Sequence, residues 1–200
     1  MRMSQKMCGI RFSFEHKGAR LGFMQAPLGG AACAGVVEEL LCKGAKRFLF
    51  VGSCGSLDAK VTSGHLLVPT AAYRDEGVSY HYAPPGDYID VPTAQRLSQV
   101  LEELHVPHTR VKTWTTDAFY RETRRNMEAR RAEGCAAVEM ECASIMAVAQ
   151  FRGAEVYQLL YTADCLDGED WDQRILGSMP EDLSRRILTV AVEAAARLNA

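Results

Sequence analysis

The sequence predicts an α/β fold, a three-layer α/β/α sandwich with a mostly parallel mixed central sheet. Apolar runs of strand length alternate along the chain with amphipathic segments of helix length, the pattern that builds such sheets. The runs at Arg47–Val51 and His65–Thr70 are apolar nearly throughout, as in strands covered on both faces. With 48% hydrophobic residues in a chain of 200, we expect a single domain over residues 1–200.

The elements are expected in a regular order. Strands are predicted at Arg11–Phe14 and Leu21–Met24 around a turn at Lys17-Gly18, then at Arg47–Val51, His65–Thr70, Thr109–Trp114, 136–140 and Glu155–Ala163. Helices are predicted at Ala31–Cys42, Thr93–His105, 121–133 and 141–152. The last helix is expected after a capping box of Ser178 and Glu181, with its apolar stripe at Leu183, Ile187, Val190, Ala194 and Leu198. The Pro- and Tyr-rich stretch Asp75–Pro92 is expected to be a functional loop.

Charge and cysteine usage narrow the class of protein. The net charge of −2 gives no footprint for nucleic acid or an anionic membrane, so the ligand is expected to be small. The seven cysteines form no CxxC pair and no metal-ligand spacing, which favours a reducing cytoplasm. No apolar run reaches the roughly 18–20 residues of a membrane span, and Met1–Lys6 is too short and polar for a signal peptide.

Two carboxylates flank a methionine where a predicted strand meets a helix, at Glu139, Met140 and Glu141. Residues two apart on an extended segment point the same way, and an ionised carboxylate accepts two hydrogen bonds at once. The pair therefore suits the neighbouring hydroxyls of a ribose. The alternative is that both acids only cap and solvate the first turn of the following helix.

Five short motifs, each of low specificity alone, occur in one order along the chain. They are Val51–Leu57 (VGSCGSL), Asp75–His81 (DEGVSYH), Thr115–Tyr120 (TTDAFY), Ala137–Ala143 (AVEMECA) and Tyr161–Asp164 (YTAD). Together they resemble the purine nucleoside and uridine phosphorylase family, over about Phe12 to Leu198.

Breaking the bond between ribose and base, the reaction that this resemblance implies, needs an acid beside the base, groups that bind the ribose and a nucleophile on the opposite face.

The resemblance implies a role for several residues around the base. Asp164, after Ala163, stands where the purine branch of the family has the aspartate that donates a proton to the base. Phe119, twenty residues before Glu139, stands where an aromatic ring covers the base, and Met140 would lie under the ribose. Each has a structural alternative, because an aspartate also caps helices or solvates loops, and Phe and Met usually fill cores.

The phosphate side of the site departs from the family pattern. Gly52 and Ser53 follow the buried strand, where backbone amides and a hydroxyl cradle phosphate in the family; a tight structural turn is the alternative. The residue before Val51 is Phe50, whereas these phosphorylases usually have an arginine that clamps phosphate there. The resemblance places the start of the chain at about the family's second strand, so we expect no counterpart of the first strand, of a Gly/Arg phosphate loop or of a histidine lent to a neighbouring subunit.

Several basic residues are candidates for compensating charge. Arg121, with Arg124 and Arg125, is one source, although a basic helix face is usually just solvated. Arg174 stands downstream of Asp164, where the family often has an arginine that helps the aspartate deliver its proton. His81 and Tyr82 resemble uridine-phosphorylase-like sequences and are alternatively surface residues.

The sequence thus predicts a pentosyltransferase, a nucleoside phosphorylase that prefers purines and yields free base and ribose 1-phosphate. It is expected to use inorganic phosphate as co-substrate and no metal or organic cofactor. The expected partners are a nucleoside, phosphate and further copies of the chain in a dimer or hexamer. A hydrolytic nucleosidase of the same superfamily remains an alternative, as does an inactive member that binds a nucleoside or assembles with a complete paralogue.

Overall fold

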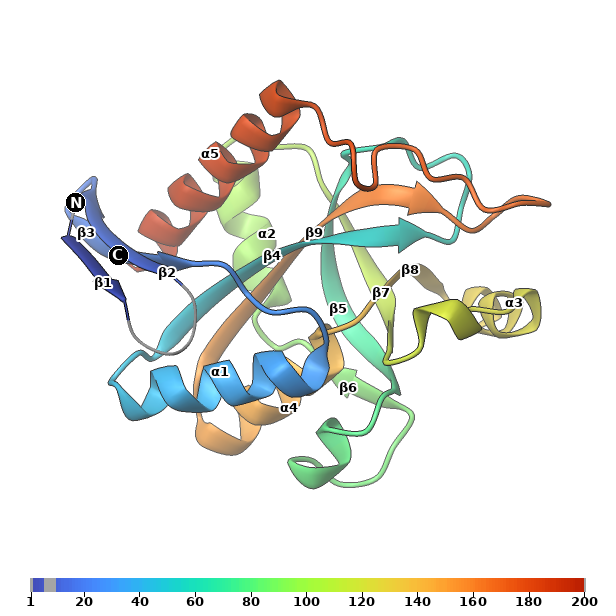
Figure 1. The fold of residues 1–200 in the computed structure, drawn as a ribbon, viewed down its shortest axis with the longest axis horizontal. Helices are drawn as coiled ribbons and strands as arrows, with labels where there is room; N and C mark the ends of the chain where they lie inside the picture. The colour runs from blue at the N-terminus through green and yellow to red at the C-terminus, as the bar shows by residue number, and fades with distance from the viewer. Residues whose placement is uncertain (1, 6–9, 200) are drawn as a thin grey trace.

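The structure is a computed structural model that describes residues 2–5 and 10–199. A small antiparallel sheet lies at the N-terminal end of the chain (Figure 1). Its strands are β1 (Arg2–Gln5), β2 (Ile10–His16) and β3 (Ala19–Met24), in the order β1-β2-β3. The turn between β2 and β3 uses two positive φ angles, 49° at Lys17 and 79° at Gly18. The predicted hairpin is confirmed.

A six-stranded mixed sheet forms the centre of the molecule. Its strands are β4 (Arg47–Ser56), β5 (Leu66–Asp75), β6 (Tyr88–Asp90), β7 (Thr109–Thr116), β8 (Cys135–Glu139) and β9 (Glu155–Cys165), in the order β6-β5-β7-β8-β4-β9. The long pairings, β4–β9 and β5–β7, are parallel, so the predicted α/β class with a mixed, mostly parallel sheet is confirmed. The sheet is more strongly curved than a flat three-layer sandwich, because β5 also pairs with β9 and closes five strands into a small barrel.

The interior of this barrel is a compact apolar cluster. Each of the five strands contributes one residue: Cys54, Leu67, Val111, Ala137 and Leu160. The larger core lies between the barrel and the helices that surround it. This arrangement brings the ends of β4, β8 and β9 close together on one side of the barrel.

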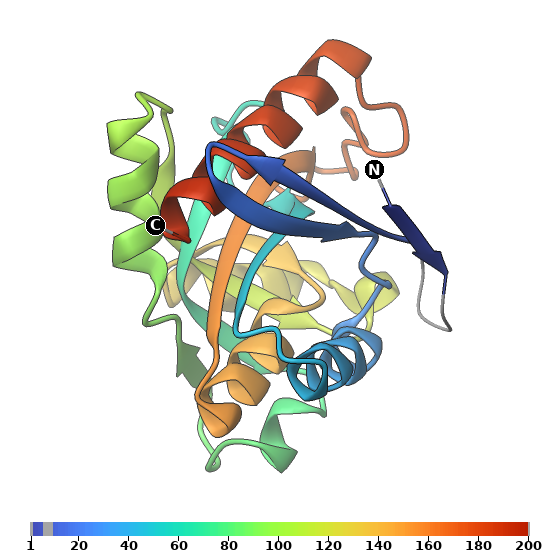
Figure 2. The same cartoon turned by 90° about the vertical axis from the view of Figure 1, so that its left-hand side faces the viewer.

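In the part of the chain that the structure describes, five α-helices pack around the sheets (Figures 1 and 2). They are α1 (Gly30–Cys42), α2 (Ala94–Glu103), α3 (Arg124–Ala132), α4 (Cys142–Arg152) and α5 (Glu181–Leu198). The predicted apolar stripe of α5 is confirmed, since Ile187, Ala194 and Leu198 belong to the main core and Leu183 and Val190 pack against it. No described helix is long and apolar enough to cross a membrane.

The start of α5 differs from the prediction. Pro180 is the N-cap residue and no side chain caps the helix, so Ser178 and Glu181 do not form a capping box. The amide of Ser178 instead donates to the carbonyl of Ile175 across 3.0 Å, in a turn that ends before the helix. The helix therefore begins at a proline, whose ring holds φ near the value that the entry to a helix needs.

The stretch Asp75–Pro92 is more ordered than the predicted irregular loop. It contains the 3₁₀ turn η1 (Ser79–His81) and strand β6. The buried Arg74 organises it, because its guanidinium donates to the hydroxyl of Ser79 across 2.7 Å and to the carbonyl of Pro84 across 2.7 Å. Such hydrogen bonds from one side chain to a neighbouring loop leave no periodic signal in the sequence.

The cysteines and the acidic residues show no sign of a cross-link or a metal centre in the part of the chain that the structure describes. Six cysteines are described there and all six are free thiols, whereas Cys8 lies outside the described residues. Within residues 2–5 and 10–199, no three His, Cys, Asp or Glu side chains are grouped so that they could hold a metal ion.

Candidate active site

Asp164 lies inside β9, one residue before the strand ends, and not after the strand as predicted. The pairing with β4 shifts here, because Cys54 faces Thr162 while Gly55 faces Asp164, which leaves Ala163 as the extra residue of a bulge. The carbonyl of the buried Ala163 accepts a hydrogen bond from the amide of Ile175 across 2.9 Å. Bulges are frequent beside active sites because they re-aim a side chain, here that of Asp164.

Gly55 makes room for the carboxyl group of Asp164. A Cβ atom at Gly55 would lie 3.3 Å from Oδ1 of Asp164, 3.0 Å from a methyl carbon of Val138 and 2.7 Å from one of Leu166. A side chain at position 55 therefore collides with the wall of the site. The same Gly55 pairs with Val138 of β8, so Asp164 and the residue after Val138, Glu139, lie on the two strands that flank β4.

Asp164 is nine-tenths buried, with 9% of its surface exposed. Its Oδ2 accepts a hydrogen bond from the indole N–H of Trp171 across 2.8 Å. Burial raises the pKa of Asp164 above its usual value, while the Trp171 hydrogen bond and the charge of Arg174 oppose that rise. A raised pKa favours the protonated form that a general acid requires.

Glu139 ends β8 with its carboxylate fully engaged by protein donors. Oε1 accepts from the hydroxyl of Thr115 at 2.5 Å, and Oε2 accepts from the backbone amides of Glu141 and Cys142 at 2.8 and 2.7 Å. Burial raises the pKa of Glu139 to about 7, while these hydrogen bonds oppose the rise. Glu139 therefore caps the first turn of α4, as the structural alternative held, and its role toward ribose stays a prediction.

Glu141 is half-buried at the N-cap position of α4 and reaches to the start of α1. Its Oε1 accepts from the backbone amide of Gly29, the N-cap residue of α1, across 2.6 Å. Burial raises the pKa of Glu141. Met140 lies half-buried between the two acids. The Glu139–Glu141 segment thus joins the ends of β8 and β7 to the first turns of α1 and α4.

Phe119 is in the 3₁₀ turn η2 (Phe119–Arg121), which follows β7. The residue is 43% exposed, and its ring lies 4.2 Å from the ring of Tyr120, centroid to centroid. Phe119 is therefore not core filler, and a ring with an open face can stack on a nucleobase. Its placement after the carboxyl end of β7 is as predicted.

Gly52 and Ser53 are part of β4 and do not form a turn. The strand runs on to Ser56 and pairs Gly52 with Leu160 and Ser53 with Tyr161. The alternative of a tight structural turn is therefore wrong, and the role of Gly52 and Ser53 toward phosphate stays a prediction. The Ser53 side chain is hydrogen-bonded to Tyr161, and Phe50 packs half-buried against the main core.

The predicted arginines have different surroundings. Arg121 is exposed at the end of η2, and α3 begins only at Arg124, after the N-cap Thr123, so the predicted helix 121–133 starts later than expected. Arg125 is exposed on α3. Arg174 donates to Oδ2 of Asp172 at 3.0 Å and to the carbonyls of Val61 and Ala59 at 2.6 and 3.2 Å, and its charge also acts to lower the pKa of Asp164.

Sequence reasoning did not single out Glu122, which directly follows η2. Burial, and then the negative charge of Asp164, raise the pKa of Glu122 to about 7. No pattern in the sequence pointed to Glu122, because its burial depends on how the chain folds after η2. Glu122, Asp164 and Phe119 thus belong to one region of the molecule.

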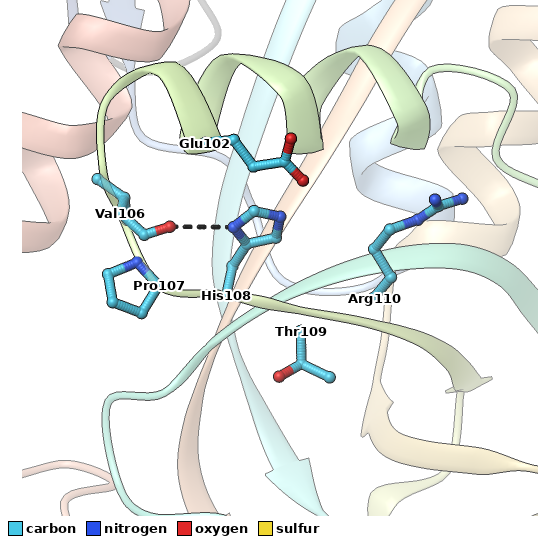
Figure 3. Close-up of a pocket in the computed structure, with 6 residues that line it drawn as sticks. All are labelled: Glu102, Val106, Pro107, His108, Thr109 and Arg110. Carbon is cyan, nitrogen blue, oxygen red and sulfur yellow. Dashed lines mark hydrogen bonds between the residues drawn. The ribbon is translucent and has the colours of Figure 1, made fainter.

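A surface pocket of about 460 Å³ lies elsewhere, at the connection between α2 and β7 (Figure 3). Its lining residues are Glu102, Val106, Pro107, His108, Thr109 and Arg110. The His108 ring is hydrogen-bonded to the Val106 carbonyl and the Ser98 hydroxyl, each at 3.0 Å. Thr109 begins β7, whereas Thr115, the partner of Glu139, lies six residues further on, roughly 20 Å along an extended strand.

Comparison with known proteins shows which family has this fold with carboxylates at the strand ends. Residues 7–198 match the family model described as the phosphorylase superfamily, and the chain belongs to this superfamily. Over 191 residues it is 30% identical to a purine nucleoside phosphorylase of Plasmodium vivax, covering 92% of this chain and 76% of the relative. Over 146 residues it is 31% identical to a guanosine phosphorylase of Halorubrum lacusprofundi, covering 70% of this chain and 58% of that relative.

A solved structure shows the same fold. Purine nucleoside phosphorylase from Toxoplasma gondii, in complex with immucillin-H, superposes with a TM-score of 0.85 at 21% identity, covering 99% of this chain and 82% of the other. The likeness extends over nearly all of the chain, barrel and surrounding helices included.

Proposed function

We propose that the protein cleaves the N-glycosidic bond of a purine nucleoside with phosphate, giving the free base and ribose 1-phosphate. The observation that carries this proposal is the buried Asp164, whose pKa is raised, at the bulge where β9 meets the end of β4. It supplies an acid for the base, and Phe119 offers a stacking face nearby. Both relatives named above are called nucleoside phosphorylases of purines, which supports the same assignment.

In this proposal the residues divide the reaction between them. Asp164 gives its proton to a ring nitrogen of the base as the bond to the sugar breaks, so that the base leaves neutral. Glu141 and Met140 contact the ribose, while Glu139 holds the N-terminus of α4 in place. Gly52 and Ser53 contribute to the phosphate side, and an oxygen of phosphate forms the new bond to C1′. Arg121 is a source of positive charge there, while Arg174 helps Asp164 to deliver its proton.

Phe50 favours a second candidate, hydrolysis. Phenylalanine offers no charge or hydrogen bond to phosphate, and Phe50 packs against the apolar core rather than lining a polar site. Water as the nucleophile needs no charged side chain at this position. The two reactions differ in product, because phosphorolysis yields ribose 1-phosphate and hydrolysis yields ribose.

One assay separates the candidates. Inosine, adenosine and uridine are incubated with and without phosphate, and both the base and the sugar product are quantified. The proposal expects release of base from purine nucleosides that depends on phosphate, with ribose 1-phosphate as product. Free ribose at an unchanged rate without phosphate identifies a nucleosidase. Binding of nucleosides without turnover identifies an inactive member of the superfamily.

The assembly and compartment belong to the same proposal. We infer a homo-oligomer, a dimer or hexamer, that works in the cytoplasm with phosphate as co-substrate and no metal or organic cofactor. Free thiols at all six described cysteines fit a reducing compartment. Analytical ultracentrifugation tests the assembly, and a fully active monomer at micromolar concentration contradicts it.

A further inference from the structure

Trp171 is a largely exposed residue that donates a hydrogen bond to the proposed acid. Its Nε1 lies 2.8 Å from Oδ2 of Asp164. The residue is 56% exposed, whereas Asp164 is nine-tenths buried. In the part of the chain that the structure describes, Trp171 belongs to none of the apolar core clusters. The position of its ring is therefore explained by the bond to Asp164 and not by packing in a core.

The backbone next to Trp171 is tied to the strand that carries Asp164. The loop after β9 folds back, so that Cys165 and Asp172 exchange two backbone hydrogen bonds of 2.9 and 3.0 Å. Cys165 directly follows Asp164, and Asp172 directly follows Trp171. This bridge therefore holds the indole beside the carboxyl group.

The outer part of the same loop is fastened to its surroundings by charged side chains. The guanidinium of Arg124 donates to the carbonyl of Gly168 across 2.6 Å. Asp167 forms an ion pair with Arg131 and accepts a hydrogen bond from the amide of Ala59 across 3.1 Å. These contacts join the loop to α3 and to the segment after β4. Trp171 is thus presented by a loop that is anchored on both sides.

The hydrogen bond selects which oxygen of Asp164 carries the proton. An indole N–H only donates, and in a protonated carboxyl group the oxygen without hydrogen is the better acceptor. With Oδ2 bonded to Trp171, the arrangement with the proton on Oδ1 is favoured. The terminal torsion of an aspartate is broad and roughly twofold, so without this donor the two oxygens exchange places more readily.

Other groups also act on the charge of Asp164. Those that interact with it are Arg174 and Asp172 in the loop after β9, Glu122 after η2, and Cys54 on β4. The backbone amide of Asp164 itself favours the carboxylate as well. Of the side chains that the structure describes, only that of Trp171 is hydrogen-bonded to the carboxyl group. Trp171 is therefore the side chain that can fix its orientation.

We propose that Trp171 is a positioning residue for the general acid, whose indole N–H holds the carboxyl group of Asp164 with its proton on Oδ1 and stabilises the carboxylate that forms when this proton leaves. The inference rests on the proposed function, because it concerns the acid of that reaction. When the glycosidic bond breaks, its electron pair stays on the base and the proton passes from Oδ1 to a ring nitrogen. The bond from Trp171 strengthens as Asp164 becomes charged, and Asp164 takes up a proton from water before the next turnover.

The first experiment measures kcat and KM against pH for the wild type and Trp171→Phe, which keeps a ring but removes the N–H. With inosine, kcat should fall about tenfold with KM little changed, because the carboxylate loses a charge-assisted hydrogen bond. Loss of a donor to the ionised form raises the pKa of Asp164, so the alkaline limb should move to higher pH by about one unit. With a nitrophenyl riboside, whose leaving group needs no proton, neither kcat nor the limb should change.

Two further variants separate the N–H from the ring and from a general loss of stability. Trp171→Leu removes both ring and N–H and should move the alkaline limb as far as Trp171→Phe does. Trp114→Phe is the matched control, because it removes an indole N–H that donates to Asp75 across 3.0 Å, and it should leave the limb in place. An unmoved limb in Trp171→Phe, a shift in Trp171→Leu alone, or an equal loss on both substrates overturns the proposal.

The indole N–H signals in a proton–nitrogen NMR spectrum test the bond without turnover. The chain has two tryptophans, so Trp171→Phe assigns both signals. The Trp171 signal should shift as Asp164 ionises, and Asp164→Asn should abolish this shift while leaving the Trp114 signal unchanged. A Trp171 signal that does not respond to pH, or responds equally in Asp164→Asn, overturns the proposal.

The failure of this inference and the failure of the proposed function give different results. If Asp164→Asn retains full activity on inosine, the proposed function itself fails. If Asp164→Asn loses that activity while Trp171→Phe keeps the kcat and the alkaline limb of the wild type, only the role of Trp171 fails.

Discussion

The backbone amide of Gly29 donates a hydrogen bond to Oε1 of Glu141 across 2.6 Å, and this contact links the N-terminal turns of α1 and α4. It places a half-buried carboxylate where two helix N-termini meet. Helix N-termini favour negative charge, so the position suits an ionised Glu141. The proposed ribose-binding residue is thereby held by the fold and is not a mobile surface side chain.

Replacing Glu141 tests its role toward the sugar. If its carboxylate accepts hydrogen bonds from the 2′- and 3′-hydroxyls, 2′-deoxynucleosides should react worse than ribonucleosides, because an unpaired buried acceptor costs about 1–3 kcal/mol. Glu141→Ala should lose this preference. Glu102→Ala, which removes an exposed carboxylate of α2, should keep it. The measurement is the ratio of kcat/KM for inosine and 2′-deoxyinosine, and an unchanged ratio in Glu141→Ala removes that residue from the ribose site.

The close contact of α1 with α4 makes Gly30 sensitive to substitution. A Cβ atom there would lie 2.1 Å from Oγ and 2.8 Å from Cβ of Ser144, well inside contact distance. Gly30→Ala should lower the free energy of unfolding by about 1–3 kcal/mol, the usual cost of overpacking. Gly35→Ala, in the same helix but facing open space, should raise it by about 0.5–1 kcal/mol. Urea denaturation of both variants decides, and equal effects would show that α1 and α4 do not pack this closely.

The fold could be predicted where the hydrophobic period decides the structure. The stripe of α5 and the alternation of strands with helices follow from side-chain spacing, and both are confirmed. The barrel closure could not be predicted, because it depends on pairing between Leu66 and Tyr161, residues far apart in sequence. The C-terminal end of β4 was also missed, since a turn was one interpretation of the glycines at 52 and 55, although the neighbouring strand keeps them extended.

The candidate site could be predicted in part. Motif order pointed to Asp164 and Phe119, and the structure places both on the side where β7 and β9 end. The hydrogen-bond partners could not be foreseen, since Thr115 and Gly29 reach Glu139 and Glu141 only after folding.

The phosphate side of the site is tested by restoring the charge that Phe50 lacks. Phe50→Arg supplies a guanidinium able to bind phosphate in a bidentate manner, so it should lower the KM for phosphate and speed phosphorolysis. Phe50→Leu is the control, because it alters packing without adding charge. The readout is initial rate against phosphate concentration. If Phe50→Arg folds and behaves as Phe50→Leu does, β4 does not line the phosphate site or water is the nucleophile.

The raised pKa of Glu139 predicts a stability that depends on pH. A carboxyl group in an unfolded chain titrates near 4.3, whereas that of Glu139 titrates at about 7 in the folded protein. Between these values the folded state binds more protons, so stability should fall as pH rises from about 4.5 to 7, by on the order of 3 kcal/mol. Glu139→Gln should flatten this part of the curve. The measurement is the urea midpoint of the wild type and of Glu139→Gln at pH 5 and at pH 7. If the midpoint changes equally between the two pH values in both proteins, the pKa of Glu139 is not raised.

The central claim is that Asp164 acts as the general acid, and Asp164→Asn on two substrates tests it most directly. General acid catalysis is typically worth about 10²–10⁴-fold, so the variant should lose that much kcat with inosine. A nitrophenyl riboside has a leaving group that departs without a proton, and the variant should retain most of its activity on it. An equal loss on both substrates contradicts the account and leaves Asp164 as a structural residue that receives the Trp171 hydrogen bond.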